Sequence, residues 1–430
     1  MSELASPAAF AEDEGYAATA PLAQRLLNIV LFVTVMLSSI AFIEPSPHDG
    51  LMIILLAMCV AARVPFDRKL IPLMLLLIVW LIGGFFSVIP VLDQKQTLQY
   101  VATSGYLVLA AIMFACLFCD GNLVRLTILR RAYIIAALIA TTAGYVGFFH
   151  LAPGSDIFLF NDRVSATFKD PNVYGPFLIF PLLLLLIGVM TRGMGVFSLA
   201  IMTFLFGGLV LSFSRGAWVH FAVSAAVAVL LLFVAAPEPR MRRRILLFSV
   251  ATLVAMVLFV IALLLIPTVH DLFLERAKVI QPYDVGPGGR FWEQKLALSV
   301  ILDHPNGLGP FEFFRQFGTQ QHDVYMQGFL VYGWVGGMAY FTLVMVTLVI
   351  GLRSALIAAP WQAYLIAAYA AFVGEAFEGF IVDTDHWRHF FLLLGLVWGL
   401  TAASLNLWKG EMEDALPDDA EAPSPAGCGR

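Results

Sequence analysis

Long apolar runs recur along most of the chain and are separated by short polar stretches. Most of the runs have about 17–25 residues, which is the length that an α-helix needs to cross the ~30 Å hydrocarbon layer of a bilayer. The clearest is Ile245–Ile266, which contains no charged residue. The other predicted spans are Leu22–Ile43, Leu51–Ala62, Leu70–Ile89, Leu98–Phe118, Leu123–Phe149, Val173–Met190, Val196–Ser212, Ala217–Ala236, Met326–Leu352, Trp361–Val382 and Phe390–Leu407. The pattern predicts an all-α polytopic membrane protein with about twelve transmembrane helices.

The composition of the chain supports this prediction. Of its 430 residues, 60% are hydrophobic and 13% are charged, whereas an ordinary soluble domain has roughly 25% charged residues. Too few charges are present to cover a water-facing surface, which excludes a soluble globular protein. The formal net charge is −5, so the chain lacks the excess of basic residues that a nucleic-acid-binding protein needs. We therefore expect the lipid bilayer as a partner and no nucleic acid.

The distribution of Lys and Arg predicts the orientation of the spans. Short loops rich in these residues stay on the cytoplasmic side, and the strongest such cluster lies at 240–244. Residues 1–21 and 409–430 are acidic and rich in small residues or Pro, so we expect them to be disordered cytoplasmic tails. Between the tails, the predicted organisation is transmembrane helices 1–5 at 22–150, an outer loop at 151–172, helices 6–9 at 173–267, a large outer loop with short helices at 268–325, and helices 10–12 at 326–408.

Several basic residues fall on the outer side, against this orientation rule. Arg163 and Lys169 belong to the first outer loop, Arg215 lies in a tight turn that begins a span, and Arg290 follows a run of glycines in the large loop. Taken alone, Arg215 also fits an interfacial arginine that reaches the lipid head groups, and Arg290 fits an ordinary surface residue. These separate interpretations do not explain why the basic residues share a position near predicted helix starts.

Local sequence predicts those helix starts. Asp170-Pro171 is typical of an N-cap acceptor followed by proline at the first helical position. A serine in the turn Ser212–Gly216 is a cap, and Phe291–Asp303 is a helix that Pro305 and Gly307 end. Cations beside helix N-termini are unfavourable unless an anion binds there, and phosphate suits such sites. The set therefore predicts a phosphate or pyrophosphate site on the outer face, as the head of a lipid-linked donor would require.

Residues with acid–base chemistry lie near the same predicted face. A neutral His322 near the arginines can take a proton from an attacking hydroxyl, with Asp323 or another carboxylate orienting it. A histidine that only forms a hydrogen bond at the interface is the alternative. Glu375 and Glu378 lie one turn apart inside a predicted span, where carboxylates are costly; we expect them to pair with the arginines or to contact sugar hydroxyls. The D-x-D at 383–385 is a pattern that elsewhere can hold a divalent ion for sugar-nucleotide chemistry, and we interpret it here as a solvated turn.

Four motifs resemble those of the O-antigen ligase and polymerase superfamily of bacterial membrane glycosyltransferases. They lie between Asp162 and Trp398 and read F-K-D-P-N-V-Y-G, S-R-G-A-W, G-G-R-F-W through H-P-N-G-L-G, and H-D-V-Y-M-Q-G-F-L-V-Y-G-W-V-G-G. The resemblance implies a GT-C-like, metal-independent enzyme without a cofactor, which moves a glycan from undecaprenyl diphosphate to a hydroxyl of lipid A-core or of another lipid-linked repeat. It also implies that Arg215 and Arg290 hold the diphosphate and that His322 is the general base. Asp323 departs from the family, which commonly has Asn, Ser or Gln after that histidine.

We therefore expect a bacterial inner-membrane glycosyltransferase that acts on the periplasmic side and has both termini in the cytoplasm. It would be an O-antigen or exopolysaccharide polymerase or an O-antigen ligase, with Arg163 and Lys169 assisting at the diphosphate. The alternative is a polytopic transporter or a lipid-linked glycan flippase, which the number of spans would also suit. Transporters place their sites near the membrane midplane, whereas the charges of this chain cluster at the outer ends of the predicted spans.

Overall fold

The structure is a computed structural model that describes residues 21–43, 45–193, 195–276, 278, 286 and 288–414. Most of the two predicted tails therefore lies outside the described residues. The described part of the chain is helical apart from its loops and one short antiparallel hairpin, formed by β1 (Leu159–Phe160) and β2 (Arg163–Val164). Short 3₁₀ turns occur at η2 (Leu37–Ser39), η3 (Arg68–Leu70), η4 (Ile89–Val91) and η5 (Ser155–Phe158).

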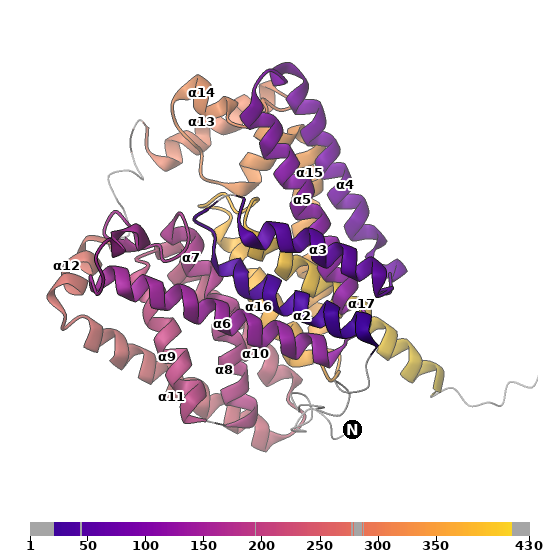
Figure 1. Ribbon diagram of the computed structural model, residues 1–430, viewed down its shortest axis with the longest axis vertical. Helices are drawn as coiled ribbons and strands as arrows, with labels where there is room; N and C mark the ends of the chain where they lie inside the picture. Colours follow the sequence, from indigo (N-terminus) through magenta and orange to yellow (C-terminus); the bar gives the residue numbers. More distant parts are fainter. Residues whose placement is uncertain are drawn as a thin grey trace, which may run out of the picture.

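Every apolar run predicted as a span is helical in the structure (Figure 1). These helices are α2 (Leu22–Met36), α3 (Pro47–Ala61), α4 (Ile71–Val88), α5 (Lys95–Phe118), α6 (Leu123–Phe148), α7 (Pro171–Phe177) with α8 (Ile179–Arg192), α9 (Val196–Leu211), α10 (Arg215–Ala235), α11 (Pro239–Leu263), α15 (Val324–Ala355), α16 (Gln362–Glu378) and α17 (Arg388–Asp414). Among the described residues, eight helical segments are long and apolar enough to cross a membrane, and α3 and α9 are shorter apolar helices. The all-α polytopic fold is confirmed, while the total of about twelve spans remains a prediction.

The burial of individual helices fits a bundle surrounded by lipid. Helix α8 lies at the centre, and each of its residues from Ile179 to Met190 is buried. Helix α11 begins with the basic cluster at 240–244 and is apolar from Ile245 onward, yet only Ile245 and Thr252 are buried. An apolar helix with so little buried surface is stable where its outer face meets lipid rather than water.

The large loop between α11 and α15 contains the short helices expected for it. They are α12 (Pro267–Arg276), α13 (Arg290–Asp303) and α14 (Glu312–Phe317). Helix α13 ends before Pro305 and Gly307, as predicted. Figure 1 shows α12 at the left edge of the molecule, where it follows the end of α11, whereas α13 and α14 lie at the end of the molecule formed by α4, α5 and α15. The loop therefore extends from one side of the bundle to the other.

Glycines set the position of α15. A Cβ atom on Gly83 of α4 would lie 2.8 Å from the Cα atom of Gly336, so the two helices approach each other at backbone contact. Gly333 interrupts α15 with φ 66° and ψ −176°, a conformation open essentially only to glycine. At this kink the Trp334 amide donates to the Pro305 carbonyl at 2.8 Å. The kink thereby fixes the segment that leads from α13 to α14.

Candidate functional site

Hydrogen bonds of the Asn172 and Arg163 side chains join the segment at 151–172 to the start of α10. The Oδ1 atom of Asn172 accepts from Arg163 Nη2 and from Ser214 Oγ, both at 2.9 Å. Arg163 Nε also donates to the Ser212 carbonyl at 3.0 Å. In the sequence, Asn172 belongs to the motif F-K-D-P-N-V-Y-G and has no predicted role. The structure makes it the residue that connects Arg163 to the turn before Arg215.

The caps in this region follow the sequence prediction. Asp170 is the N-cap of α7 and accepts from the Asn172 amide at 2.7 Å, with Pro171 at the first helical position. Ser214 is the N-cap of α10 and accepts from the Ala217 amide. Both predicted helix starts are confirmed. They could be predicted because a cap depends on only a few consecutive residues.

Arg215 is the first residue of α10, and its side chain reaches the large loop. Its Nη1 atom donates to the carbonyl of Lys278 at 2.9 Å. Lys169 is exposed next to Asp170 in the first loop. The segment at 151–172 and the loop between α11 and α15 therefore meet at the start of α10.

Arg290 is the first residue of α13, with Gly289 as the N-cap. His322 lies within electrostatic range of this arginine. Partial burial lowers the pKa of His322, the positive charge of Arg290 lowers it further, and the carboxylates of Glu293 and Asp170 act in the opposite direction. The same interactions mean that α13 and the first outer loop both approach the histidine. An imidazole in this setting is neutral at neutral pH and can accept a proton.

Asp383, in the loop between α16 and α17, supplies the carboxyl group beside His322. Its Oδ2 atom lies 3.8 Å from His322 Nδ1. Burial raises the pKa of Asp383 to about 8, and the nearby carboxylates of Asp385 and Asp323 act in the same direction. Asp383 is therefore largely protonated at neutral pH.

The carboxylate of Asp323 points to the backbone of α15. As the N-cap of that helix, it accepts from the amides of Tyr325 at 2.9 Å and Met326 at 3.0 Å. Burial raises the pKa of Asp323, while the two backbone hydrogen bonds lower it. Asp323 thus fixes the start of α15 immediately after His322, whose backbone has a left-handed φ of 48°.

Glu375 and Glu378 are buried and lie against histidines. Glu378 Oε2 is 2.8 Å from His220 Nδ1, and Glu375 Oε1 is 3.3 Å from His389 Nε2. A Cβ atom on Gly216 would lie 2.7 Å from Glu378 Oε1, which places that carboxyl group at the start of α10. The sequence gives no sign of the His220–Glu378 contact, because the two residues are 158 positions apart along the chain.

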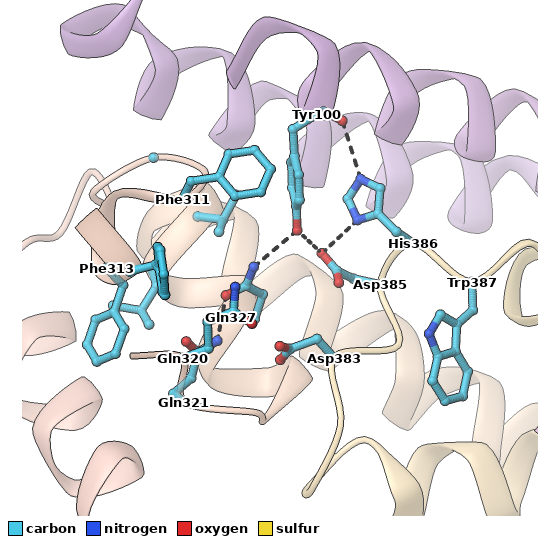
Figure 2. A pocket seen from close by; sticks show the side chains of 14 residues that line it. Tyr100, Phe311, Phe313, Gln320, Gln321, Gln327, Asp383, Asp385, His386 and Trp387 are labelled. Atoms are coloured by element: carbon cyan, nitrogen blue, oxygen red, sulfur yellow. Dashed lines mark hydrogen bonds and ion pairs between the residues drawn. The ribbon is translucent and has the colours of Figure 1, made fainter. Parts of the chain in front are cut away.

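The D-x-D at 383–385 is not a solvated turn, and that interpretation is wrong. Asp385 is 3% exposed, and its Oδ2 atom accepts from the Tyr100 hydroxyl at 2.7 Å. Together with Asp383 and His386, it lines a cavity of about 210 Å³ (Figure 2). In the described part of the chain, no group of three or more His, Cys, Asp or Glu residues could hold a metal ion.

A second cavity is larger and apolar. It has a volume of about 840 Å³ and lies between α8, α9, α10 and α11, with Phe273 of α12 at its edge. Trp218 lines it from α10, one helical turn after Arg215. The ring of Trp218 stacks on Phe273 with 5.5 Å between the centroids. A cationic helix start therefore adjoins an apolar cavity between α8, α9, α10 and α11.

One comparison with known proteins identifies a related family. The model of a family described as O-antigen ligase matches residues 197–341, a segment that runs from α9 into α15 and contains Arg215, Arg290 and His322. A search of the curated proteins found no match. The resemblance to the O-antigen ligase and polymerase superfamily is confirmed by this segment, which supports a membrane glycosyltransferase activity of that general kind.

Proposed function

We propose that this protein transfers or polymerises a glycan that is linked to undecaprenyl diphosphate, on the periplasmic face of the inner membrane. One observation carries the proposal: the apolar cavity of about 840 Å³ reaches Trp218, one turn from the cation at the start of α10. A lipid diphosphate has matching chemistry, with a long apolar chain attached to a polar anion. The polyprenyl chain would occupy the cavity, and its diphosphate would lie at Arg215.

Arg215 and Arg290 are the proposed diphosphate ligands, with Arg163 and Lys169 assisting. Guanidinium groups bind phosphate oxygens in pairs, and the free backbone amides of a helix N-terminus add to this binding. Arg163 is held next to the α10 start through Asn172. Binding at these groups would neutralise the charge that develops on the leaving diphosphate, and so accelerate its departure.

His322 is the proposed general base. The acceptor hydroxyl attacks the anomeric carbon of the donor sugar, and its proton passes to the imidazole of His322. The new glycosidic bond forms as the bond between the anomeric carbon and the diphosphate oxygen breaks. Polyprenyl diphosphate leaves with the bonding electron pair. A neutral imidazole is required at the start, as the lowered pKa of His322 favours.

The remaining predicted site residues are proposed to position His322 and the diphosphate ligands. They are Asp323, Glu375 and Glu378. Asp323 would orient His322 by fixing the first turn of α15, to which its carboxylate is bonded. Glu378 would support the start of α10, which it contacts at Gly216. Glu375 would act from the same helix through His389.

The direct test uses purified protein in detergent with an undecaprenyl-diphosphate oligosaccharide, with and without lipid A-core. A polymerase lengthens the lipid-linked glycan without lipid A-core, and a ligase forms product only when lipid A-core is present. Mass spectrometry of the products separates these outcomes. Transfer in detergent, where no compartment exists, would also exclude a role limited to transport or flipping.

Matched variants connect the activity to the site. We expect Arg290→Ala and His322→Ala to reduce transfer by about 100-fold or more. Lys295→Ala, on the exposed face of the same helix as Arg290, and His304→Ala, an exposed histidine of the same loop, should retain transfer. Normal transfer by the first pair would overturn the proposed roles.

A further inference from the structure

The smaller cavity has the chemistry of a site for a neutral polyhydroxylated ligand. Its volume is about 210 Å³. Among the described residues that line it, none is Lys or Arg, so the cavity lacks the groups that would bind a phosphate. The lining instead combines aromatic rings with amide and carboxyl groups, which accept and donate hydrogen bonds as sugar hydroxyls do. These residues include Tyr100, Phe314, Gln321, Gln327, Asp383 and Asp385.

A chain of hydrogen bonds holds the polar wall of this cavity in one arrangement. Gln321 donates to Gln327, Gln327 Nε2 donates to the Tyr100 hydroxyl at 3.1 Å, and that hydroxyl donates to Asp385 at 2.7 Å (Figure 2). His386 lies beside the end of this chain, with Nδ1 3.2 Å from Asp385 Oδ2. Groups fixed in this way present their remaining donors and acceptors without rearrangement, as a preformed binding site does.

Asp383 provides an unused hydrogen-bonding atom at the same cavity. Its Oδ1 atom is buried and has no hydrogen-bond partner among the described residues. Leaving a buried polar atom unsatisfied is costly, so such an atom calls for a partner from outside the protein. In Figure 2 the carboxyl group of Asp383 points toward the side of the cavity formed by Gln320 and Gln321. A ligand hydroxyl at this position would satisfy Oδ1.

The position of Asp383 relates this cavity to the proposed chemistry. Its second oxygen lies 3.8 Å from His322 Nδ1, so a hydroxyl bound to Asp383 would be next to the proposed base. The cationic groups assigned to the donor diphosphate are absent from the lining. We infer that the cavity binds a neutral sugar ring of the acceptor glycan and presents its hydroxyl to His322. This inference rests on the proposed glycosyltransferase function and assigns the binding site of the second substrate.

A binding experiment tests the assignment without requiring turnover. The probes are neutral oligosaccharides released by mild acid from the surface polysaccharide of the source cells, and inorganic pyrophosphate. We expect Gln327→Met and Phe314→Ala to weaken oligosaccharide binding by about tenfold or more in calorimetry, because each removes a contact to the ring. Phe317→Ala, a matched change on an exposed ring of α14 that does not line the cavity, should leave it unchanged. Pyrophosphate binding should be unchanged in all three variants and weakened by Arg290→Ala.

Kinetics with both substrates distinguish acceptor from donor. In Gln327→Met and Phe314→Ala, the KM for the acceptor should rise about tenfold or more, while the KM for the donor and the rate of donor hydrolysis by water stay at wild-type values. An equal rise in the KM for the donor would assign the cavity to the donor sugar and overturn the inference. Undiminished oligosaccharide binding by both variants, or no binding by the wild type, would also overturn it. Failure of the proposed function would differ, because the wild type itself would then transfer no glycan.

Discussion

The Nδ1 atom of His322 lies 3.8 Å from the Oδ2 atom of Asp383, which belongs to the loop between α16 and α17. The pKa values of the two groups are shifted in opposite directions. The pKa of His322 is lowered by burial and by Arg290, while burial and neighbouring carboxylates raise the pKa of Asp383 to about 8. At neutral pH both groups are therefore mainly uncharged. With a neutral imidazole beside a protonated carboxyl group, the site holds a proton acceptor before an anionic substrate binds.

This relationship predicts the pH dependence of glycan transfer. Because the pKa of His322 is lowered from 6.5, the imidazole remains neutral below pH 6.5, and the acid limb of the kcat/KM profile should lie below that value. Arg290→Gln removes the positive charge that disfavours the imidazolium, so the limb should move to higher pH as the overall rate falls by about 100-fold. Lys295→Gln, on the same helix but exposed, should leave the limb in place. An unmoved limb in Arg290→Gln would contradict the electrostatic role.

Asp383 predicts a pH dependence of stability. Its pKa in the folded protein, about 8, lies above the ordinary value of 3.8, so the folded state retains a proton that the unfolded chain releases. The contribution of this group to stability is therefore lost as the pH rises through this window and is constant above it. Asp383→Asn removes the dependence. As the pH rises from about 5 to 8, the Tm of the variant in detergent should therefore rise relative to that of the wild type. Asp303→Asn, at an exposed position, should show no such trend, and a pH-independent Tm difference for Asp383→Asn would contradict the prediction.

The sequence predicts the helices and their starts well because both depend on nearby residues. The apolar runs require helices in a bilayer, and Asp170, Ser214 and the glycines before Arg290 act on the first turn that follows them. The composition of the large loop likewise predicts α13 to within a residue.

Contacts between distant segments are not accessible in this way. His220 appears isolated in the sequence, because its partner Glu378 reaches it only when α10 packs against α16. Asp385 appears solvated, because the burial of that carboxylate depends on Tyr100 of α5. Asp383 becomes the neighbour of His322 through the same long-range packing. A single sequence specifies which residues can take part in chemistry, while tertiary packing specifies the pairs.

Gly333 predicts a strong effect on folding. Its backbone has φ 66° and ψ −176°, and an added Cβ would lie 2.7 Å from the carbonyl carbon of Asn306. Gly333→Ala should therefore destabilise the protein by about 3 kcal/mol or more, through backbone strain together with the steric clash. Thermal unfolding in detergent measures the change. Gly105→Ala, in α5, has nothing within 4 Å of its added Cβ, and it should be neutral or slightly stabilising.

Asn172 predicts a combined effect on stability and donor binding. Its Oδ1 atom accepts from both Arg163 and Ser214, and Asn172→Ala leaves these donors without that acceptor. We expect a loss of about 1–3 kcal/mol in the free energy of unfolding and weaker binding of inorganic pyrophosphate, because Arg163 keeps only its hydrogen bond to the Ser212 carbonyl at the start of α10. His150→Ala, at an exposed position of the same loop, should change neither quantity. Unchanged pyrophosphate binding in a destabilised Asn172→Ala protein would limit Asn172 to a structural role.

The His220–Glu378 pair predicts how strongly the protein depends on a buried polar contact between α10 and α16. Both side chains are 1% exposed, with 2.8 Å between Nδ1 and Oε2. Replacing one partner strands the other in the interior, so Glu378→Ala and His220→Ala should each cost about 3–5 kcal/mol. The double variant should cost much less than the sum of the two, because neither group is then left alone. Arg315 and Glu312 form a less buried pair on α14, with side chains 34% and 13% exposed, and disrupting it should cost about 1 kcal/mol or less. Double-mutant cycles on both pairs, measured by unfolding in detergent, provide the comparison, and equal coupling energies would show that burial does not control the strength of the His220–Glu378 contact.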